Sequence, residues 1–369
     1  MCIKTRAADS DGIASGRAIV APGVLWGEGH ARDARYLYVV CGARMKRRAL
    51  LGLLGGALAA PLASFAQRQP TKAFRIGLLG LVSAAGYARQ VEALRQGFRD
   101  LGYVEGQNIV IEYRWAEGRY DRLPALAAEL IGLQPDVIVT SGPGTRVLKA
   151  ATTTIPIVMA VGGDAVVDGL VASLARPGGN ITGSTYFAPE LSAKRLEMLK
   201  DAVPRLARVA VMLNPDNRSY GVDLGLLRKT ATALKVELIE VPVRSPGDFD
   251  DAFELMLRRR ADGLVYLTDT MLVANMRRLG ELSAKNRMPG AGSDEYPEGG
   301  GLLAYGVNFP ELWRRAPYFV DKILKGANPA ATPVEQATKF ETVVNLKTAK
   351  ALGLKIPQSV LIRADRVIE

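Results

Sequence analysis

The sequence predicts an α/β protein built from two doubly wound parallel sheets, Rossmann-like in architecture and joined by a hinge. From Phe74 onward, short apolar strands alternate with amphipathic helices, the pattern of βαβ units with parallel strands. The alternation restarts after residues 186–189, and 369 residues are more than one ordinary domain needs. Each half holds roughly four such units, so we expect two domains.

Residues 45–66 have the three parts of a secretory signal peptide. Met45-Lys46-Arg47-Arg48 is a basic start, residues 49–60 are apolar, and Ser64 and Ala66 are the small residues of a cleavage site. We expect cleavage after Ala66, by Sec or twin-arginine export, and the apolar stretch is too short for a comfortable membrane anchor. We expect residues 1–44 to be an upstream extension that results from a start codon assigned too early, or else a disordered tail.

Composition excludes several kinds of chemistry from the exported part. The two cysteines, Cys2 and Cys41, and the single histidine, His30, all precede residue 66. The remainder therefore has no cysteine nucleophile, no disulfide, no Cys/His zinc site and no Ser-His-Asp triad. Nine of the 48 basic and four of the 37 acidic residues also lie there, which leaves a net charge of +6. Without a run of five like charges, this does not favour nucleic-acid binding.

The first domain begins with a strand at 75–80 and a helix at 88–101, whose Val91, Leu94 and Phe98 share one face and which Gly102 ends. The strand expected at 136–140 is largely apolar, which suits a parallel sheet buried on both faces. The other expected strands are 108–115, 155–161 and 181–186, and the other helices are 120–133, 145–151 and 167–174.

The second domain repeats this order. Strands are expected at 208–213, 236–241, 263–267, 289–292 and 302–307, and helices at 190–202, 219–234, 249–259 and 271–286. A helix at 311–325, a strand at 340–345, a short helix at 346–352 and a last segment at 359–363 complete the chain. We expect residues 72–186 plus about 308–338 to form an N-terminal lobe, and residues 187–307 plus about 339–369 a C-terminal lobe.

Ligands of open parallel sheets bind beyond the carboxyl ends of the strands. The loops at those ends are rich in small and polar residues. Tyr186 and Tyr305 lie at the expected crossings between domains, where each could stack on a ligand or pack in the hinge. The candidate ligand-binding residues are Ser83, Ser141, Gly142, Thr145, Asp164, Tyr186, Asn214, Ser219, Thr268, Asp269, Asp294 and Tyr305.

Two of these loops indicate a chemistry. Ser141-Gly142-Pro143-Gly144-Thr145 joins a buried strand to a helix, where amides and hydroxyls hold a carboxylate or another anion. It matches neither a Walker A loop nor a dinucleotide fingerprint, and ordinary capping and turn chemistry is the alternative. Asp269 is expected to accept a ligand's ammonium group, or equally to cap the next helix.

Other polar and aromatic features indicate structure rather than function. Asp294 and Glu295 are adjacent and point opposite ways on an extended segment, so a catalytic carboxylate pair is not expected. Trp115 and Trp313 are expected to pack in the core. Arg258-Arg259-Arg260 ends a helix, where cations suit the dipole and face solvent.

Three stretches resemble the ABC transporter substrate-binding family that includes tryptophan- and tyrosine-binding proteins. They are Ile155-Pro156-Ile157-Val158, residues 169–183 with the run Leu174-Ala175-Arg176-Pro177-Gly178-Gly179-Asn180-Ile181-Thr182-Gly183, and the tail 339–354. The resemblance covers residues 72–369 and implies the type I periplasmic binding protein fold. It marks the family and not the ligand. Family members often have Asp-Pro where this chain has Asp164-Ala165, so local turn geometry there is expected to differ.

The resemblance implies a periplasmic receptor of an ABC importer that captures a small polar ligand, amino-acid-like or an aromatic acid, by hinge closure. The expected partner is an ABC permease in the inner membrane, with its ATPase on a separate polypeptide. The protein is expected to be a monomer, to bind no nucleic acid, metal or cofactor, and not to be an enzyme. A periplasmic sensor that signals to a membrane partner, or an exported α/β enzyme, are the alternatives. A DNA-binding repressor shares the fold class, but a signal peptide stands where its headpiece would be.

Overall fold

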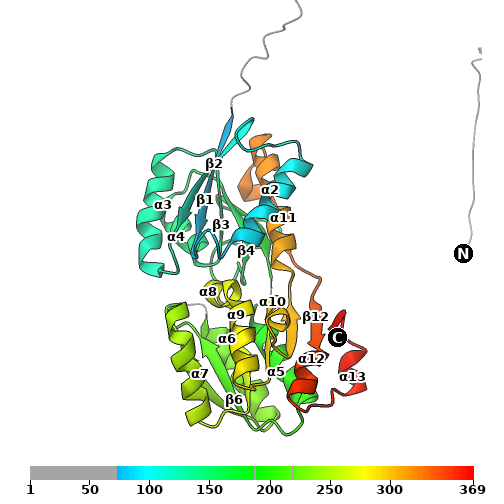
Figure 1. Cartoon of the computed structure of the whole chain (residues 1–369). Coiled ribbons are helices and arrows are strands. Elements are labelled where there is room, and N and C mark those ends of the chain that lie inside the picture. Colours follow the sequence, from blue (N-terminus) through cyan, green and yellow to red (C-terminus); the bar gives the residue numbers. More distant parts are fainter. Residues whose placement is uncertain (1–72, 187, 218–219) are drawn as a thin grey trace, which may run out of the picture. The chain divides into compact units, whose positions relative to one another are not determined.

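A computed structural model describes residues 73–186, 188–217 and 220–369. The expected signal peptide at 45–66, the segment before it and the candidate residue Ser219 lie outside the described residues. Residues Arg68–Glu369 form one compact unit, in which two sheets occupy separate lobes (Figure 1). The prediction of an α/β fold with two doubly wound sheets is confirmed.

The first lobe holds a six-stranded sheet in the order β11-β5-β4-β3-β1-β2, with every neighbouring pair parallel. All residues of β3 and β4 are buried, as apolar strands covered on both faces require. The strands are β1 (Phe74–Gly80), β2 (Ile109–Trp115), β3 (Val137–Ser141), β4 (Ile157–Gly162), β5 (Ile181–Thr185) and β11 (Glu335–Gln336).

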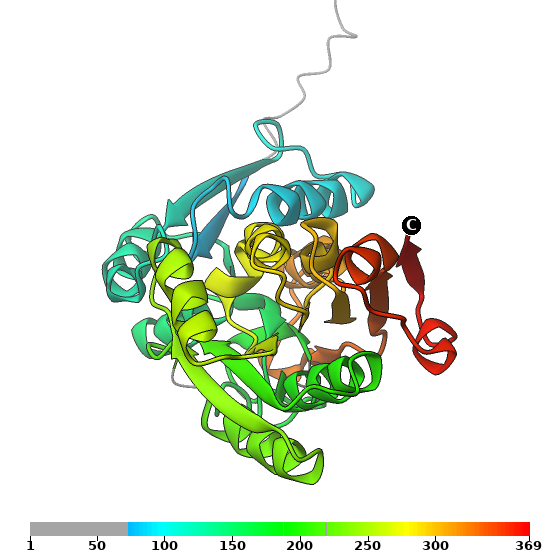
Figure 2. The ribbon, with the colours of Figure 1, turned by 60° about the horizontal axis from the view of Figure 1, so that its bottom comes forward.

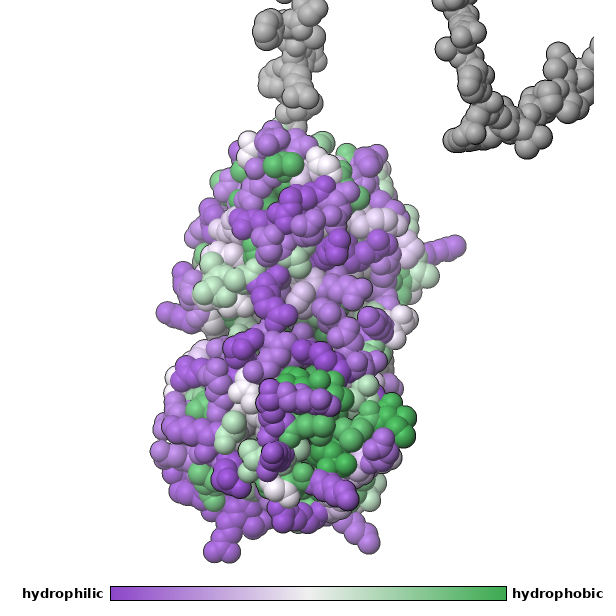
Figure 3. All heavy atoms as spheres, turned by 45° about the vertical axis from the view of Figure 1, so that its right-hand side comes forward, coloured by the Kyte–Doolittle hydropathy of each residue, from purple (hydrophilic) through white to green (hydrophobic). Residues whose placement is uncertain are grey.

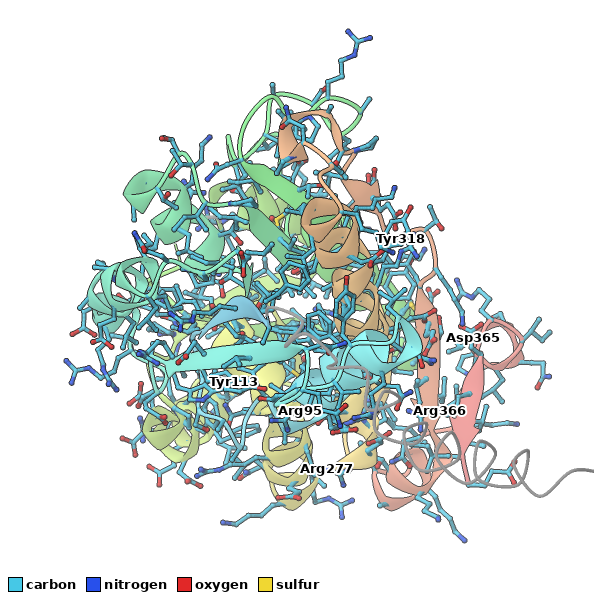
Figure 4. The ribbon with its side chains drawn as sticks, turned by 90° about the horizontal axis from the view of Figure 1, so that it is seen from above. Arg95, Tyr113, Arg277, Tyr318, Asp365 and Arg366 are labelled. Carbon is cyan, nitrogen blue, oxygen red and sulfur yellow. The ribbon has the colours of Figure 1, made fainter. Side chains whose placement is uncertain are left out.

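Helices cover both faces of this sheet (Figure 1). α3 (Leu123–Gly132) and α4 (Pro143–Ala151) lie on one face, and α2 (Ala88–Asp100) and α11 (Phe309–Leu324) on the other. The last two pack closely because Gly97 has no side chain: a Cβ there would lie 2.2 Å from the Arg314 carbonyl oxygen. At the outer edge, Arg95 of α2 lies over the ring of Tyr113 of β2, 5.6 Å from its centroid (Figure 4).

The second lobe holds a seven-stranded sheet in the order β13-β12-β10-β9-β8-β6-β7. Only β10 and β12 pair antiparallel among the described strands. The C-terminal segment forms one edge of this sheet, drawn in red in Figure 2. The strands are β6 (Arg208–Leu213), β7 (Glu237–Pro242), β8 (Gly263–Tyr266), β9 (Gly290–Gly292), β10 (Leu303–Gly306), β12 (Glu341–Asn345) and β13 (Arg366–Ile368).

Most helices of this lobe follow the expected alternation. They are α5 (Ala188–Ala202), α6 (Tyr220–Ala233), α7 (Phe249–Arg258), α8 (Thr270–Ala274), α9 (Met276–Lys285), α10 (Glu295–Glu298), α12 (Leu346–Ala351) and α13 (Gln358–Leu361). Figure 3 shows apolar surface gathered on one face of this lobe; Ile362 and Val367 of its C-terminal segment are exposed. No helix in the described ranges is long and apolar enough to cross a membrane.

The described chain passes between the lobes three times, after β5, after β10 and after β11. Aromatic pairs connect these crossings. Tyr186 of the first crossing packs edge-on against Phe309 of the second, with 5.8 Å between ring centroids. Tyr305 at the end of β10 stacks on Phe340 of the third crossing at the same distance. The three crossings therefore pack on one another through these rings.

Several expected elements differ from the structure. Residues 167–174 form turns and no helix, because the Asp164 carboxylate accepts the N–H groups of Val166 and Val167 and Gly169 takes a φ of +64°. The single helix expected at 271–286 is divided into α8 and α9 at Asn275. Three short elements, β11, α10 and β13, were not expected from the sequence.

Candidate ligand-binding cleft

A cavity of about 1130 Å³ lies between the two lobes. Loops from the carboxyl ends of strands in both sheets line it, at the place where open parallel sheets hold their ligands. Its volume suits a small organic molecule. The polar and charged lining side chains include Gln90, Arg119, Tyr120, Asp121, Ser141, Arg146, Asp164, Asp168, Asp216, Asn217, Asp223, Arg244, Thr268, Asp269 and Thr270.

Half of the twelve sequence-predicted site residues line this cavity. They are Ser141, Gly142, Asp164, Tyr186, Thr268 and Asp269. Ser219 lies outside the described residues. The other five, namely Ser83, Thr145, Asn214, Asp294 and Tyr305, are not among the residues that line it.

Three of these five serve the turns and helices beside the cavity. Ser83 accepts the N–H of Gly86 in the turn before α2, and Asn214 accepts the N–H of Asp216 in the turn after β6. Thr145 is fully buried in α4. For Ser83 and Asn214, these bonds are those of short polar side chains that satisfy neighbouring backbone groups.

The other two are Tyr305 and Asp294. Tyr305 stacks on Phe340 of the third crossing. Asp294 directly precedes α10 in the second lobe, where burial and the neighbouring Glu295 raise its pKa to about 6. Neither side chain is among the described residues that line the cavity.

Asp269 is the most heavily hydrogen-bonded carboxylate in the lining. Its Oδ1 accepts the N–H groups of Met271 and Leu272 at the start of α8, at 2.9 and 3.3 Å. Its Oδ2 accepts from the Tyr120 hydroxyl at 2.5 Å and from the Asn217 amide at 3.1 Å. Burial raises its pKa, and these four hydrogen bonds lower it in part. Helix capping, the expected alternative, is present, and little of the carboxylate remains for a ligand.

Tyr120 lines the cavity but was not among the candidate residues predicted from the sequence. It lies in the 3₁₀ turn η1 (Tyr120–Arg122) of the first lobe and reaches the buried carboxylate of the second lobe. Burial and the charge of Asp269 raise its pKa, so the phenol stays protonated as a donor. An isolated tyrosine at a helix start gives no local signal of a partner 149 residues away.

The loop at the start of α4 is less open to an anion than expected. The Ser141 hydroxyl hydrogen-bonds the buried Tyr87 hydroxyl at 2.9 Å. Gly142 has a φ of +54°, and its N–H donates to the carbonyl of Val161. A Cβ on Gly142 would lie 2.5 Å from the Thr270 hydroxyl of the other lobe, so the lobes touch at this point. Pro143 adds no N–H.

Asp223, in the first turn of α6, was also missed. It lines the cavity with 5% of its surface exposed. Burial first, and then the negative charge of Asp168, raise its pKa from 3.8 to about 6, while the Arg195 guanidinium and its own N–H lower it in part. An acidic residue in a first helical turn is common for electrostatic reasons alone, so its position in the sequence gave no distinct signal.

The described lining is acidic, with seven carboxylates and three arginines. Each arginine is paired with a lining aspartate: Arg119 with Asp121, Arg146 with Asp168 and Arg244 with Asp216, at 2.6, 3.1 and 3.5 Å. No group of three or more metal-ligating side chains occurs in the described part of the chain.

Aromatic side chains form the apolar wall of the cavity. Tyr87, Tyr186, Phe309 and Trp313 all contribute. Trp313 is 2% exposed and packs on Tyr87 with 5.3 Å between centroids, so the expected packing role is combined with cavity lining. An apolar wall with a few converging polar groups is typical of small-molecule sites.

Comparison with known proteins identifies the family. Residues 75–368 match the model of the ABC transporter substrate binding protein family. A curated relative, the tyrosine-binding protein of Clostridioides difficile strain R20291, is 26% identical over 283 residues, which are 76% of this chain and 81% of the relative.

Solved structures share the fold. A conserved domain protein from Vibrio cholerae is 26% identical, with a TM-score of 0.73 over 80% of this chain and 100% of that one. A Streptococcus pneumonia ABC domain in complex with L-Trp is 24% identical, with a TM-score of 0.70 over 79% and 100%. The expected type I periplasmic binding protein fold is thereby confirmed, as is the expectation that the protein is not an enzyme. The chain belongs to the family of ABC transporter substrate-binding proteins.

Proposed function

We propose that this protein is the ligand receptor of an ABC importer and captures a small amine-bearing molecule, amino-acid-like in size, between its two lobes. One observation carries the proposal: a cavity of about 1130 Å³, with both polar and aromatic side chains, is lined from both lobes. The aromatic wall suits a ligand with an apolar body. The relatives named for tyrosine and solved with L-Trp support a ligand of this size.

Hinge closure is the proposed capture step. Three crossings connect the lobes, and contacts such as Tyr120 with Asp269 join their facing edges. A ligand that touches both lobes stabilises the arrangement in which they meet, because it has more partners there than in an open form. The closed form would be the state that a permease recognises.

The location and partners follow from the same proposal. The signal peptide at 45–66 would direct the chain to the periplasm, where it would act as a monomer. An ABC permease of the inner membrane would receive the ligand, with its ATPase on a separate polypeptide.

A thermal-shift screen tests this function. The protein, purified after expression of the full chain, is heated with L-tryptophan, L-tyrosine, their decarboxylated amines, their deaminated acids and a set of sugars. A ligand at 100 times its dissociation constant stabilises a protein by about 2.7 kcal/mol. We expect a clear shift with at least one amine-bearing compound. No shift with any compound, and no small molecule released on unfolding in native mass spectrometry, would contradict the proposal.

A further inference from the structure

Asp223 differs from the other aspartates of the described lining in its lack of partners. Within the described residues, the only hydrogen bond to its side chain comes from its own backbone N–H. An arginine pairs with each of Asp121, Asp168 and Asp216. Two backbone N–H groups donate to Asp164, and four donors reach Asp269. A carboxylate that is 5% exposed and lines a cavity without such donors is electrostatically incomplete.

We propose that Asp223 is the anchor for a positively charged nitrogen of the ligand, and that the ligands of this receptor are organic amines whose positive charge, and not a carboxylate, is required for binding. The inference rests on the proposed function, because it assumes that a ligand occupies the cleft. An ammonium or guanidinium group beside Asp223 supplies the donors that the carboxylate lacks.

The charges around Asp223 favour a cation. Asp168 of the first lobe acts on it across the cavity, and the two negative charges repel. The guanidinium of Arg195, on α5, offsets this only in part. Among the described residues, the other titratable groups that act on Asp223 are the phenols of Tyr186 and Tyr220, which burial keeps protonated and neutral. A cation placed here is attracted to carboxylates of both lobes at once, so its binding also favours their approach.

The described lining offers fewer partners to a ligand's carboxylate than to a cation. The three arginines of the described lining are each paired with an aspartate. At the start of α4, the Ser141 hydroxyl is bonded to Tyr87, and Gly142 is covered by Thr270. With seven carboxylates against three arginines, the described part of the lining favours cations over anions.

The aromatic wall indicates the rest of the ligand. Tyr186, Phe309 and Trp313 line the same cavity as Asp223. Flat apolar rings pack well on such side chains, and a neighbouring ring also stabilises a cation. The inferred class is therefore an amine with an aromatic or alkyl body.

Isothermal titration with three probe classes tests the inference. Tryptamine and tyramine carry an amine alone, L-tryptophan and L-tyrosine carry both groups, and indole-3-propionate and 3-(4-hydroxyphenyl)propionate carry a carboxylate alone. We expect the first two classes to bind and the third to bind at least about tenfold more weakly, the loss expected when a charged hydrogen-bond partner is removed. Affinity of the amines should decline below pH 6, as Asp223 is protonated.

Two variants test the role of Asp223 in amine binding. Asp223→Asn is expected to lose about 10- to 100-fold in amine affinity and to lose the pH dependence of binding, while its circular dichroism remains that of the wild type. Asp201→Asn removes a carboxylate of α5 outside the cavity lining, one that is half-exposed and paired with Arg363; its amine affinity should change by less than about threefold.

The outcomes separate this inference from the proposed function. If the acids bind the wild type as tightly as the amines, or if Asp223→Asn binds amines normally, the inference is wrong although the protein is still a receptor. If no amine binds, the inference is wrong as well. If in addition no probe of any class binds and no small molecule co-purifies, the proposed function is also contradicted.

Discussion

The Tyr120 hydroxyl of the first lobe donates a 2.5 Å hydrogen bond to Oδ2 of Asp269 in the second lobe. The acceptor is 2% exposed and caps α8 through its other oxygen. A single side chain thus connects the facing edge of one lobe to the first turn of a helix in the other. Because the carboxylate is buried, this contact is worth more than one at the surface.

Tyr120→Phe removes this contact and little else. We expect ligand affinity to fall about tenfold, since a hydrogen bond to a charged group contributes about 1.5 kcal/mol or more, and here it stabilises only the arrangement in which the lobes meet. Titration calorimetry with an identified ligand measures the effect. Tyr103→Phe is the matched control, because Tyr103 donates to Asp321 at 2.9 Å within the first lobe. It should lower stability without a change in affinity, and equal affinity losses for both variants would contradict this role of Tyr120.

Asp269→Ala is expected to destabilise the protein itself. The variant leaves the Tyr120 hydroxyl, the Asn217 amide and two N–H groups of α8 without their acceptor. Loss of a helix cap together with unpaired buried donors costs about 2–4 kcal/mol. Urea unfolding of the ligand-free protein measures this loss, and Asp269→Asn, which retains one acceptor oxygen, should recover part of it. A variant as stable as the wild type would indicate that the donors find water instead.

The sequence predicted the sheets better than it predicted the cavity. Strands 136–140 and 263–267 were recognisable because apolar residues buried on both faces form continuous runs. Parallel strands end at one edge, so Ser141 and Asp269 were expected near a common cleft, and both line the cavity. Which side chains meet across that cleft depends on how the lobes face one another, and no local pattern encodes it. Tyr120 and Asp223 were missed for that reason.

Local turn chemistry explains the remaining differences. Asp164 was expected to contact a ligand, and it lines the cavity, but its Oδ1 also organises the turn that replaces the helix expected at 167–174. Asn214 similarly serves the turn after β6. Short polar side chains bind both ligands and neighbouring N–H groups, and the sequence alone does not say which they will do.

Asp223→Asn is expected to stabilise the ligand-free protein at neutral pH. The folded-state pKa of Asp223 is about 6, above its ordinary 3.8, so the folded chain binds the proton more tightly than the unfolded chain. Stability from this group is therefore fully present below about pH 4, falls as pH rises, and is lost above about pH 6. The variant should gain up to about 3 kcal/mol at pH 7.5 and nothing near pH 4.

Unfolding in urea at these two pH values measures the difference. Asp223 would then lower the stability of the ligand-free protein while it supports amine binding. Residues of binding sites often reduce stability in this way. A variant that is equally stable or less stable at pH 7.5 would show that the ionised carboxylate has favourable partners after all.

A second contact between the lobes lies nearer the surface. Arg89 of α2 pairs with Glu295 of α10 at 2.7 Å and approaches Glu298 at 3.8 Å. Glu298 also pairs with Arg277 and Arg366, so α10 keeps a cationic neighbour when Arg89 is replaced. Half of the Arg89 side chain is exposed, which places this ion pair in the weak, salt-sensitive class.

Arg89→Ala should therefore weaken ligand binding by no more than about fivefold at low ionic strength, the limit set by about 1 kcal/mol for an exposed pair. The effect should vanish in 1 M salt, where the screening length is about 3 Å. Arg99→Ala is the control, because Arg99 pairs with Glu92 inside α2 and joins nothing across the lobes. The loss in Tyr120→Phe, by contrast, should persist at high salt, because its acceptor is buried. Titrations of the three variants at low and high salt thus distinguish a screened contact from a buried one, and a salt-independent loss in Arg89→Ala would show that this pair is shielded from solvent when the lobes meet.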